Sequence, residues 1–130
     1  MREIKFRAWD KNKKEMELLD SFFEVQKMCK TENELNNLVL MQFTGLKDKN
    51  GKDIYEGDIV KHIPTIVDMD DHCPHLRIIK WNEKYGCLSF FRLDGTEGGS
   101  GFTYCKENLE KLFEVIANIY ENPELLEAQQ

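Results

Sequence analysis

The sequence predicts a mainly β protein of the α+β class, with a small barrel or strongly bent sheet preceded by an α+β segment. Several short runs of β-branched and apolar residues favour strands, Gly- and Asn-containing turns separate them, and helical patterns are few. At 130 residues one domain is expected. Residues 1–45 are predicted to form the N-terminal segment (strand, turn, short helix, strand). Residues 46–130 are predicted to form the barrel and a short C-terminal helix, and the two parts can pack as one compact unit.

The first predicted strand covers residues 3–9, where apolar and polar side chains alternate. One face is expected to carry Ile4, Phe6 and Ala8, and the other Lys5, Arg7 and Trp9. A polar turn follows at 10–16. Residues 17–30 fit a strand or a helix equally well. Thr31 and Glu34 form a capping-box pattern that predicts a short helix, and 38–43 reads as a buried strand.

The stretch from Thr44 to Val60 is rich in turn signals. Asn50-Gly51 predicts a type I′ turn, in which both residues take positive φ, and Asp48 is expected to bond its own downstream backbone. Gly45 and Gly57 mark positions that a Cβ would hinder. The predicted result is that two reversals turn four side chains inward: Ile54, Tyr55, Ile59 and Val60. The glycine spacing matches no phosphate-binding loop.

The C-terminal half predicts further short strands. The predicted strands are 58–63, 76–81, 87–93 and 113–120, with a hairpin at 82–86. Two loops interrupt them, a proline-bounded loop at 64–75 and a glycine-rich loop at 94–105. Asn122 is expected to cap a short helix that begins at Pro123.

Three blocks of sequence, residues 2–16, 41–61 and 113–126, read REIKFRAWDKNKKEM, MQFTGLKDKNGKDIYEGDIVK and FEVIANIYENPELL. In this order they resemble the YopX family, small proteins of phages and prophages of Gram-positive bacteria. The resemblance implies a C-terminal SH3-like barrel, an N-terminal α+β portion and a phage-related origin. It supplies no activity and no catalytic residues. The family usually has Gly where this chain has Ala117, so positive φ is not required there.

Composition and cysteine usage point to the cytosol. No stretch approaches the roughly 18 apolar residues that span a bilayer, and the N-terminus lacks the apolar region of a signal peptide. A cytoplasmic location in the bacterial host is therefore expected, with no membrane partner. The four cysteines, Cys29, Cys73, Cys87 and Cys105, form no C-x-x-C pair and are predicted to be free, buried, apolar groups.

The most site-like stretch is the loop that contains His72, Cys73 and His75. These are zinc-ligand types, but they come from one short loop, with only His62 as a ligand from elsewhere. A solvated loop explains them as well, and a Cys73 nucleophile would need neighbours that meet it in space. We expect no metal and no cofactor.

A second candidate is a nucleic-acid face at the N-terminus, formed by Arg2, Lys5, Arg7 and Trp9. The alternative is that Lys5 and Arg7 are simply the solvent face of a strand. The net charge of −6 argues against general adhesion to nucleic acid but not against a local basic face.

Adjacent aromatics favour self-association. In Phe22-Phe23 and Phe90-Phe91, successive strand side chains face opposite ways, so one of each pair is covered by another segment or exposed. Three functions follow in order of preference. The first is a non-enzymatic, oligomerising phage accessory module that docks a host or phage macromolecule. The second is a nucleic-acid-binding protein acting early in the phage cycle, and the third is a metal-dependent or thiol enzyme using His72–His75.

Overall fold

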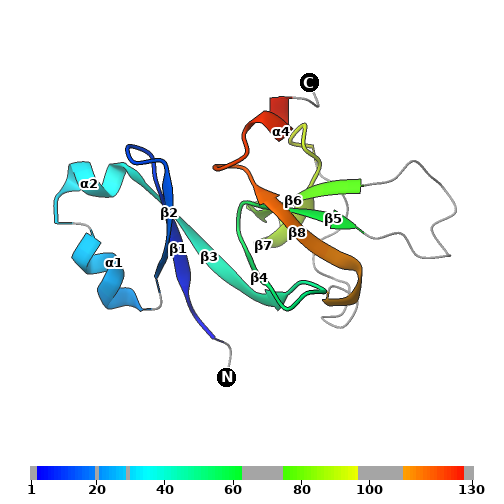
Figure 1. The fold of residues 1–130 in the computed structure, drawn as a ribbon, viewed down its shortest axis with the longest axis horizontal. Coiled ribbons are helices and arrows are strands. Elements are labelled where there is room, and N and C mark those ends of the chain that lie inside the picture. Colours follow the sequence, from blue (N-terminus) through cyan, green and yellow to red (C-terminus); the bar gives the residue numbers. More distant parts are fainter. Residues whose placement is uncertain (1–2, 20, 29, 63–74, 97–109, 128–130) are drawn as a thin grey trace, which may run out of the picture.

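The structure is a computed structural model that describes residues 3–19, 21–28, 30–62, 75–96 and 110–127. It is built mainly from two four-stranded antiparallel sheets, ordered β2-β1-β3-β4 and β7-β6-β5-β8 (Figure 1). The strands are β1 (Phe6–Asp10), β2 (Glu15–Leu19), β3 (Leu38–Lys47), β4 (Asp53–Tyr55), β5 (Asp58–His62), β6 (His75–Asn82), β7 (Cys87–Phe91) and β8 (Phe113–Asn118). The helices are α1 (Phe22–Met28), α2 (Glu32–Asn36) and α4 (Glu124–Glu127).

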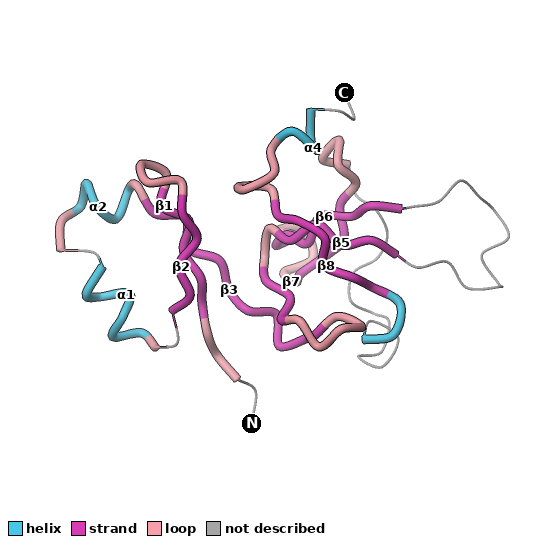
Figure 2. Tube along the Cα trace, viewed as in Figure 1, coloured by secondary structure: helices cyan, strands magenta, loops and turns pink. Residues whose placement is uncertain are grey.

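The first sheet has two differently covered faces. Figure 2 shows α1 and α2 on one side of β1 and β2, and the second sheet on the other side. Ala8 pairs with Glu17 and Leu40, whereas Arg7 pairs with Leu18 and Met41. Because side chains alternate along a strand, the Arg7 row leaves the face opposite the Ala8 row.

Strand β3 continues beyond β1 and is irregular where it pairs with β4. Gly45 has φ of 86°, and the β3–β4 register shifts between Phe43 and Lys47. The Thr44 hydroxyl spans the irregularity, donating to Ile54 O at 2.7 Å and accepting from Leu46 N at 3.1 Å. The predicted division after residue 45 falls within this strand and stays a prediction.

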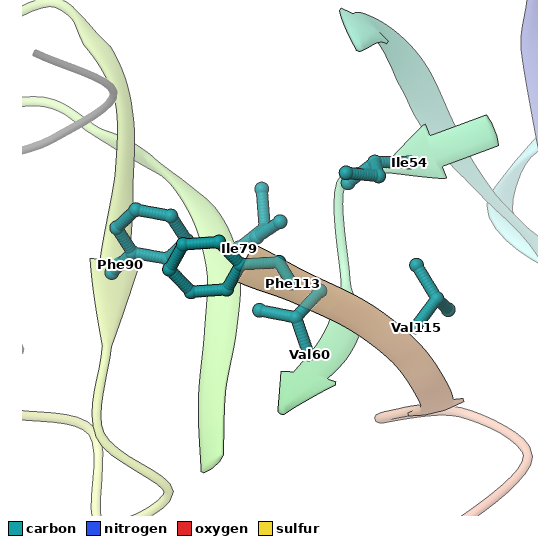
Figure 3. Packing of buried hydrophobic residues seen from close by; sticks show 6 residues of the cluster. All are labelled: Ile54, Val60, Ile79, Phe90, Phe113 and Val115. Atoms are coloured by element: carbon teal, nitrogen blue, oxygen red, sulfur yellow. The ribbon is translucent and has the colours of Figure 1, made fainter. Parts of the chain in front are cut away.

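The core of the second sheet lies between its curved inner face and β4. It consists of Ile54, Val60, Ile79, Phe90, Phe113 and Val115 (Figure 3). The rings of Phe90 and Phe113 stack with centroids 5.0 Å apart, and Val60 and Ile79 are fully buried. Burying each of these side chains contributes about 1.5–3 kcal/mol.

Most local predictions are confirmed. The ambiguous 17–30 region ends β2 and then forms α1, and Thr31 makes the predicted capping box with Glu34. The hairpin between β6 and β7 and the strand at 113–118 are present. The four side chains expected to turn inward are all buried: Ile54, Tyr55, Ile59 and Val60.

The Asn50-Gly51 turn is a reversal of a different type from the one predicted. Gly51 has φ of 79°, but Asn50 is not among the described residues with positive φ. Gly51 N donates to Asp48 O, and Asp48 N donates to Lys52 O, which closes a three-residue loop. This is the type I turn followed by a left-handed glycine, and the type I′ prediction is wrong because Lys49 is a third residue of the loop between Asp48 and Lys52.

A closed C-terminal barrel and buried cysteines were also expected. The described strands of the C-terminal part form a half-barrel, and their pairing does not confirm a closed SH3-like barrel (Figure 1). Cys87 is free, as predicted, but it is exposed because it begins the outer strand β7. The other three cysteines lie outside the described residues. No helix in the described ranges is long and apolar enough to cross a membrane.

Candidate functional site

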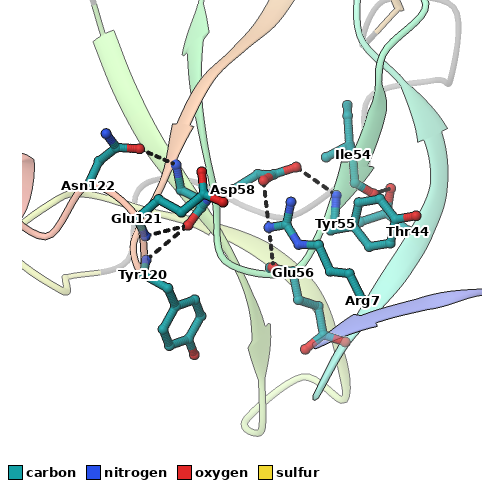
Figure 4. A network of polar contacts seen from close by, with 10 residues as sticks. Arg7, Thr44, Ile54, Tyr55, Glu56, Asp58, Tyr120, Glu121 and Asn122 are labelled. Carbon is teal, nitrogen blue, oxygen red and sulfur yellow. Dashed lines mark hydrogen bonds and ion pairs between the residues drawn. The ribbon is translucent and has the colours of Figure 1, made fainter. Parts of the chain in front are cut away.

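A buried ion pair joins the two sheets. Arg7 on β1 is 7% exposed, and its Nη2 lies 2.7 Å from Oδ1 of Asp58 at the start of β5 (Figure 4). The same Nη2 donates to Glu56 O at 3.2 Å, and the guanidinium lies 4.7 Å from the Tyr55 ring centroid. Asp58 Oδ2 accepts from Tyr55 N at 2.8 Å. The β4–β5 turn therefore supplies most of the surroundings of the Arg7 side chain.

The expectation that Lys5 and Arg7 form a solvent face is wrong for Arg7. Alternation along β1 fixes which face Arg7 leaves, but the β4–β5 turn covers that face. Lys5 is also engaged, with Nζ 2.6 Å from Asp53 Oδ2 and 4.5 Å from the Phe43 ring centroid.

Trp9 is buried as well and stacks on Tyr120 at 6.3 Å. Arg2 lies outside the described residues. The structure thus brings Lys5, Arg7 and Trp9 into contacts within the chain, and a nucleic-acid role for them stays a prediction.

Burial dominates the electrostatics of this inter-sheet contact. It raises the pKa of Asp58, although the Arg7 charge and the Tyr55 N–H act in the opposite direction. Burial also raises the pKa of Glu56, and burial together with the Glu56 charge raises the pKa of Tyr120. Arg7 Nε is buried without a hydrogen-bond partner. The arrangement holds the sheets together through one charge pair of high desolvation cost.

Asp48 explains the turn-rich stretch around it. Its Oδ1 accepts from Asn50 N at 2.8 Å and Lys52 N at 2.9 Å, which confirms the predicted support of the turn. Its Oδ2 accepts from Val115 N at 2.9 Å, so the β3–β4 hairpin is fixed to β8. The carboxylate is buried and fully used by backbone N–H groups, which is a scaffold role.

The predicted metal loop falls mostly outside the described residues. His72 and Cys73 are not described, and of His75 only the backbone at the start of β6 is described. The His62 ring lies against Phe113, with centroids 5.0 Å apart. No group of three His, Cys, Asp or Glu side chains that could hold a metal ion occurs in the described part of the chain. A zinc site in this loop stays a prediction.

A groove of about 310 Å³ lies between α2 and the β1–β2 turn. It is lined by Asp10, Asn12, Lys13, Glu17, Glu34, Asn37 and Leu38. Asp10 accepts hydrogen bonds from the backbone of its own turn, and Glu34 accepts two in the capping box of α2. Two of its three carboxylates therefore already serve local structure.

The N-terminal segment carries most of the large apolar side chains that are exposed among the described residues. Its first 40 residues hold five of the eight large apolar side chains that are exposed in the described structure. These are Ile4 (66%), Leu18 (68%), Phe23 (72%), Leu35 (54%) and Leu40 (48%). Phe23 is exposed, as one of the pair was allowed to be, but the strand alternation on which that prediction rested is wrong here, because Phe22 and Phe23 begin helix α1.

The turn between β6 and β7 exposes two aromatic side chains. Trp81 is 55% exposed and Tyr85 is 62% exposed, whereas Phe90 is in the core and Phe91 is partly covered. Lys84 Nζ lies 5.0 Å from the Tyr85 ring centroid. This surface was not predicted from the sequence, although a lysine directly before each aromatic, in Lys80-Trp81 and Lys84-Tyr85, was the available signal.

Comparison with protein families places the chain as a whole. The family model described as "YopX protein" matches residues 5–127. The chain belongs to the YopX family. The YopX resemblance predicted from three blocks is thus confirmed over nearly the whole chain.

A solved structure extends the comparison to the fold. The crystal structure of protein EF1440 from Enterococcus faecalis is 26% identical, with a TM-score of 0.61. The match covers 95% of this chain and 97% of that chain. None of the curated proteins matches. The family model therefore shows the family, and the match to EF1440 shows a similar overall fold.

Proposed function

We propose that this YopX-family protein is a non-enzymatic phage accessory module that self-associates and acts on a phage or host macromolecule by surface contact. The observation that carries the proposal is the concentration of exposed apolar side chains in the first 40 residues. The scaffold that presents them includes residues 46–130, which we infer to be SH3-like. The half-barrel and the inter-sheet contact support that inference.

Leu18 shows where the uncovered surface begins. It pairs with Arg7 in the sheet and leaves the same face, yet Leu18 is 68% exposed and Arg7 is 7% exposed. The β4–β5 turn and Tyr120 cover this face of β1 but leave Leu18 on the outer strand β2 exposed. Glu17 lies at the centre of β2, so adding two copies edge to edge would set like charges opposite each other. We therefore expect two copies to associate through side chains on the faces of their sheets and not by pairing their β2 edges.

Charge complementarity favours a second copy as the occupant. Lys11, Lys13 and Lys14 in the β1–β2 turn are exposed, as are Glu121, Glu124 and Glu127 at the C-terminal end. The ion pairs among the described residues involve none of these six side chains. Pairing between copies would bring the basic turn of one protomer to the acidic end of its partner.

Light scattering across a concentration series tests self-association. The wild type is expected to form a dimer or larger species, and Leu18→Lys combined with Phe23→Lys is expected to give a monomer. Ile116→Lys is the matched control, because Ile116 is a 44% exposed apolar residue on β8 of the other sheet. A wild-type protein that stays monomeric at high concentration would refute the proposal.

A further inference from the structure

The exposed end of the β6–β7 hairpin is a second surface, separate from the apolar N-terminal one. We define the hairpin tip as Trp81, Lys84 and Tyr85. Two aromatic side chains within five positions are each more than half exposed. Isolated exposed apolar residues are common on protein surfaces, but neighbouring exposed aromatics beside a cation are typical of binding sites.

The backbone of the tip is held in place by local hydrogen bonds. Asn82 is 5% exposed, and its Oδ1 accepts from Lys84 N at 3.0 Å. Its carbonyl oxygen accepts from Gly86 N at 2.8 Å, and Gly86 takes φ of 64° to close the turn. Lys84 and Tyr85 therefore project from an ordered turn. A preorganised surface loses less entropy when it binds a partner.

The hairpin is basic in an otherwise acidic chain. Residues 75–93 contain Arg77, Lys80, Lys84 and Arg92 and only one acidic residue, Glu83, whereas the whole chain has a net charge of −6. Lys80 leaves β6 opposite Trp81 and lies 5.7 Å from the Phe91 ring centroid. Positive charge is thus present on both sides of the tip, and the acidic remainder of the molecule would repel an anion elsewhere.

We propose that the hairpin tip binds single-stranded nucleic acid. Trp81 and Tyr85 each stack on a base, and Lys84 pairs with phosphate, with Lys80 contributing from the adjacent face. Flat aromatic faces with cations between them fit unpaired bases and the backbone that links them. A base in a duplex is already stacked and leaves no face for either ring, so the proposal commits to single strands.

The proposed nucleic-acid surface is therefore the hairpin tip and not the N-terminal strand expected from the sequence. The structure buries Trp9 and Arg7, whereas Trp81 and Lys84 are exposed. The proposal goes beyond self-association and depends on none of the residues that carry it, so the two can fail separately.

Fluorescence anisotropy with a labelled 15-nucleotide oligothymidylate, at low and increasing salt, tests the proposal on the full chain. Trp81→Ala and Tyr85→Ala are each expected to weaken binding about 5- to 150-fold. Lys84→Ala is expected to reduce the slope of log K against log salt by about 0.7. Ile116→Ala and Lys52→Ala, matched controls for an exposed apolar residue and an exposed lysine outside both proposed surfaces, are expected to bind like the wild type.

Tryptophan fluorescence gives an independent readout. The two tryptophans differ in exposure, 8% for Trp9 and 55% for Trp81, so oligothymidylate should quench mainly Trp81. The quenching should persist in Trp9→Phe and disappear in Trp81→Phe. Circular dichroism of each variant establishes that it is folded.

Three results would overturn the proposal. The first is no binding of oligothymidylate by the wild type at low salt. The second is an equal loss of binding in the hairpin variants and in the Ile116 and Lys52 controls. The third is equal competition by oligoglutamate, which would identify the partner as an acidic protein segment. Light scattering of the same hairpin variants separates these results from any change in self-association.

Discussion

Nη2 of Arg7 lies 2.7 Å from Oδ1 of Asp58, and this contact links β1 to β5 across 51 positions of sequence. Both side chains are more than nine-tenths buried. Two buried charges compensate each other only while both are present, because the remaining charge of a broken pair stays desolvated. The pair therefore makes the relative placement of the two sheets sensitive to either residue.

Removing one partner is expected to be costly. Arg7→Met and Asp58→Asn should each lower the free energy of unfolding by about 3–5 kcal/mol, measured by urea denaturation. The double variant should lose clearly less than the sum of the single losses. Lys47→Met is the control, because Lys47 pairs with Asp53 while 51% exposed and should cost about 1 kcal/mol or less. Additive single effects would show that Arg7 and Asp58 act independently.

A methyl group at Gly57 should be harmful for two reasons. Gly57 has φ of 84°, and a Cβ there would lie 3.2 Å from Tyr120 Cε2 and 3.4 Å from Met41 Sδ. Gly57→Ala is expected to destabilise by about 2–4 kcal/mol, from left-handed strain and from displacing the Tyr120 ring. Gly51→Ala has similar φ, 79°, with nothing within 4 Å, and should cost about 1–2 kcal/mol. Equal thermal midpoints for the two variants would contradict the close contact with Tyr120.

Asp48→Ala should loosen the β3–β4 hairpin and its attachment to β8 together. The substitution leaves three backbone N–H groups without their acceptor, those of Asn50, Lys52 and Val115. The expected loss is about 3 kcal/mol, with faster amide exchange at Val115, 67 positions away. Asp94→Ala is the control, because Asp94 accepts from Thr96 N and Thr96 Oγ1 within an exposed turn. Unchanged exchange at Val115 would show that Asp48 does not secure β8.

The Asp53 carboxylate makes the stability of the fold depend on pH. Burial alone would raise its pKa, but hydrogen bonds from Lys47 and Lys5 outweigh burial and hold the pKa of Asp53 below its usual value. A depressed carboxyl pKa stabilises the fold above the unfolded pKa of about 3.9, and this contribution is lost as pH falls through the folded value. The hydrogen bond to Asp53 likewise raises the pKa of Lys5. The Lys5 contribution is therefore present below about pH 10.4 and is lost as pH rises through its folded pKa.

Comparing the wild type with Asp53→Asn across pH tests the direction of this pH dependence. The wild type should exceed the variant in unfolding free energy by a constant amount, about 1 kcal/mol, between pH 5 and 8. The difference should vanish as pH falls below the folded pKa of Asp53. A difference that grows on acidification would mean that burial, and not pairing with the lysines, governs this carboxyl group.

The sequence predicted those parts of the fold that depend on neighbours along the chain. The capping box of Thr31 and Glu34, the Asp48 turn and the β6–β7 hairpin each need only a few consecutive residues, and all are present. The turn type at Asn50 was misjudged because loop length depends on where the flanking strands pair. The exposure of Trp81 was not predicted, because alternation along its strand does not show whether another segment covers that face of the sheet.

The sequence by itself therefore determined the strands other than β2 and β4, most turns, the inward side chains of the 44–60 stretch and membership of the YopX family. Only the tertiary structure decided that Arg7 is buried against Asp58, that Trp9 is covered and that Trp81 is exposed. The reason is physical. Alternation along a strand fixes the face from which a side chain leaves, but a segment distant in sequence decides whether that face meets protein or water.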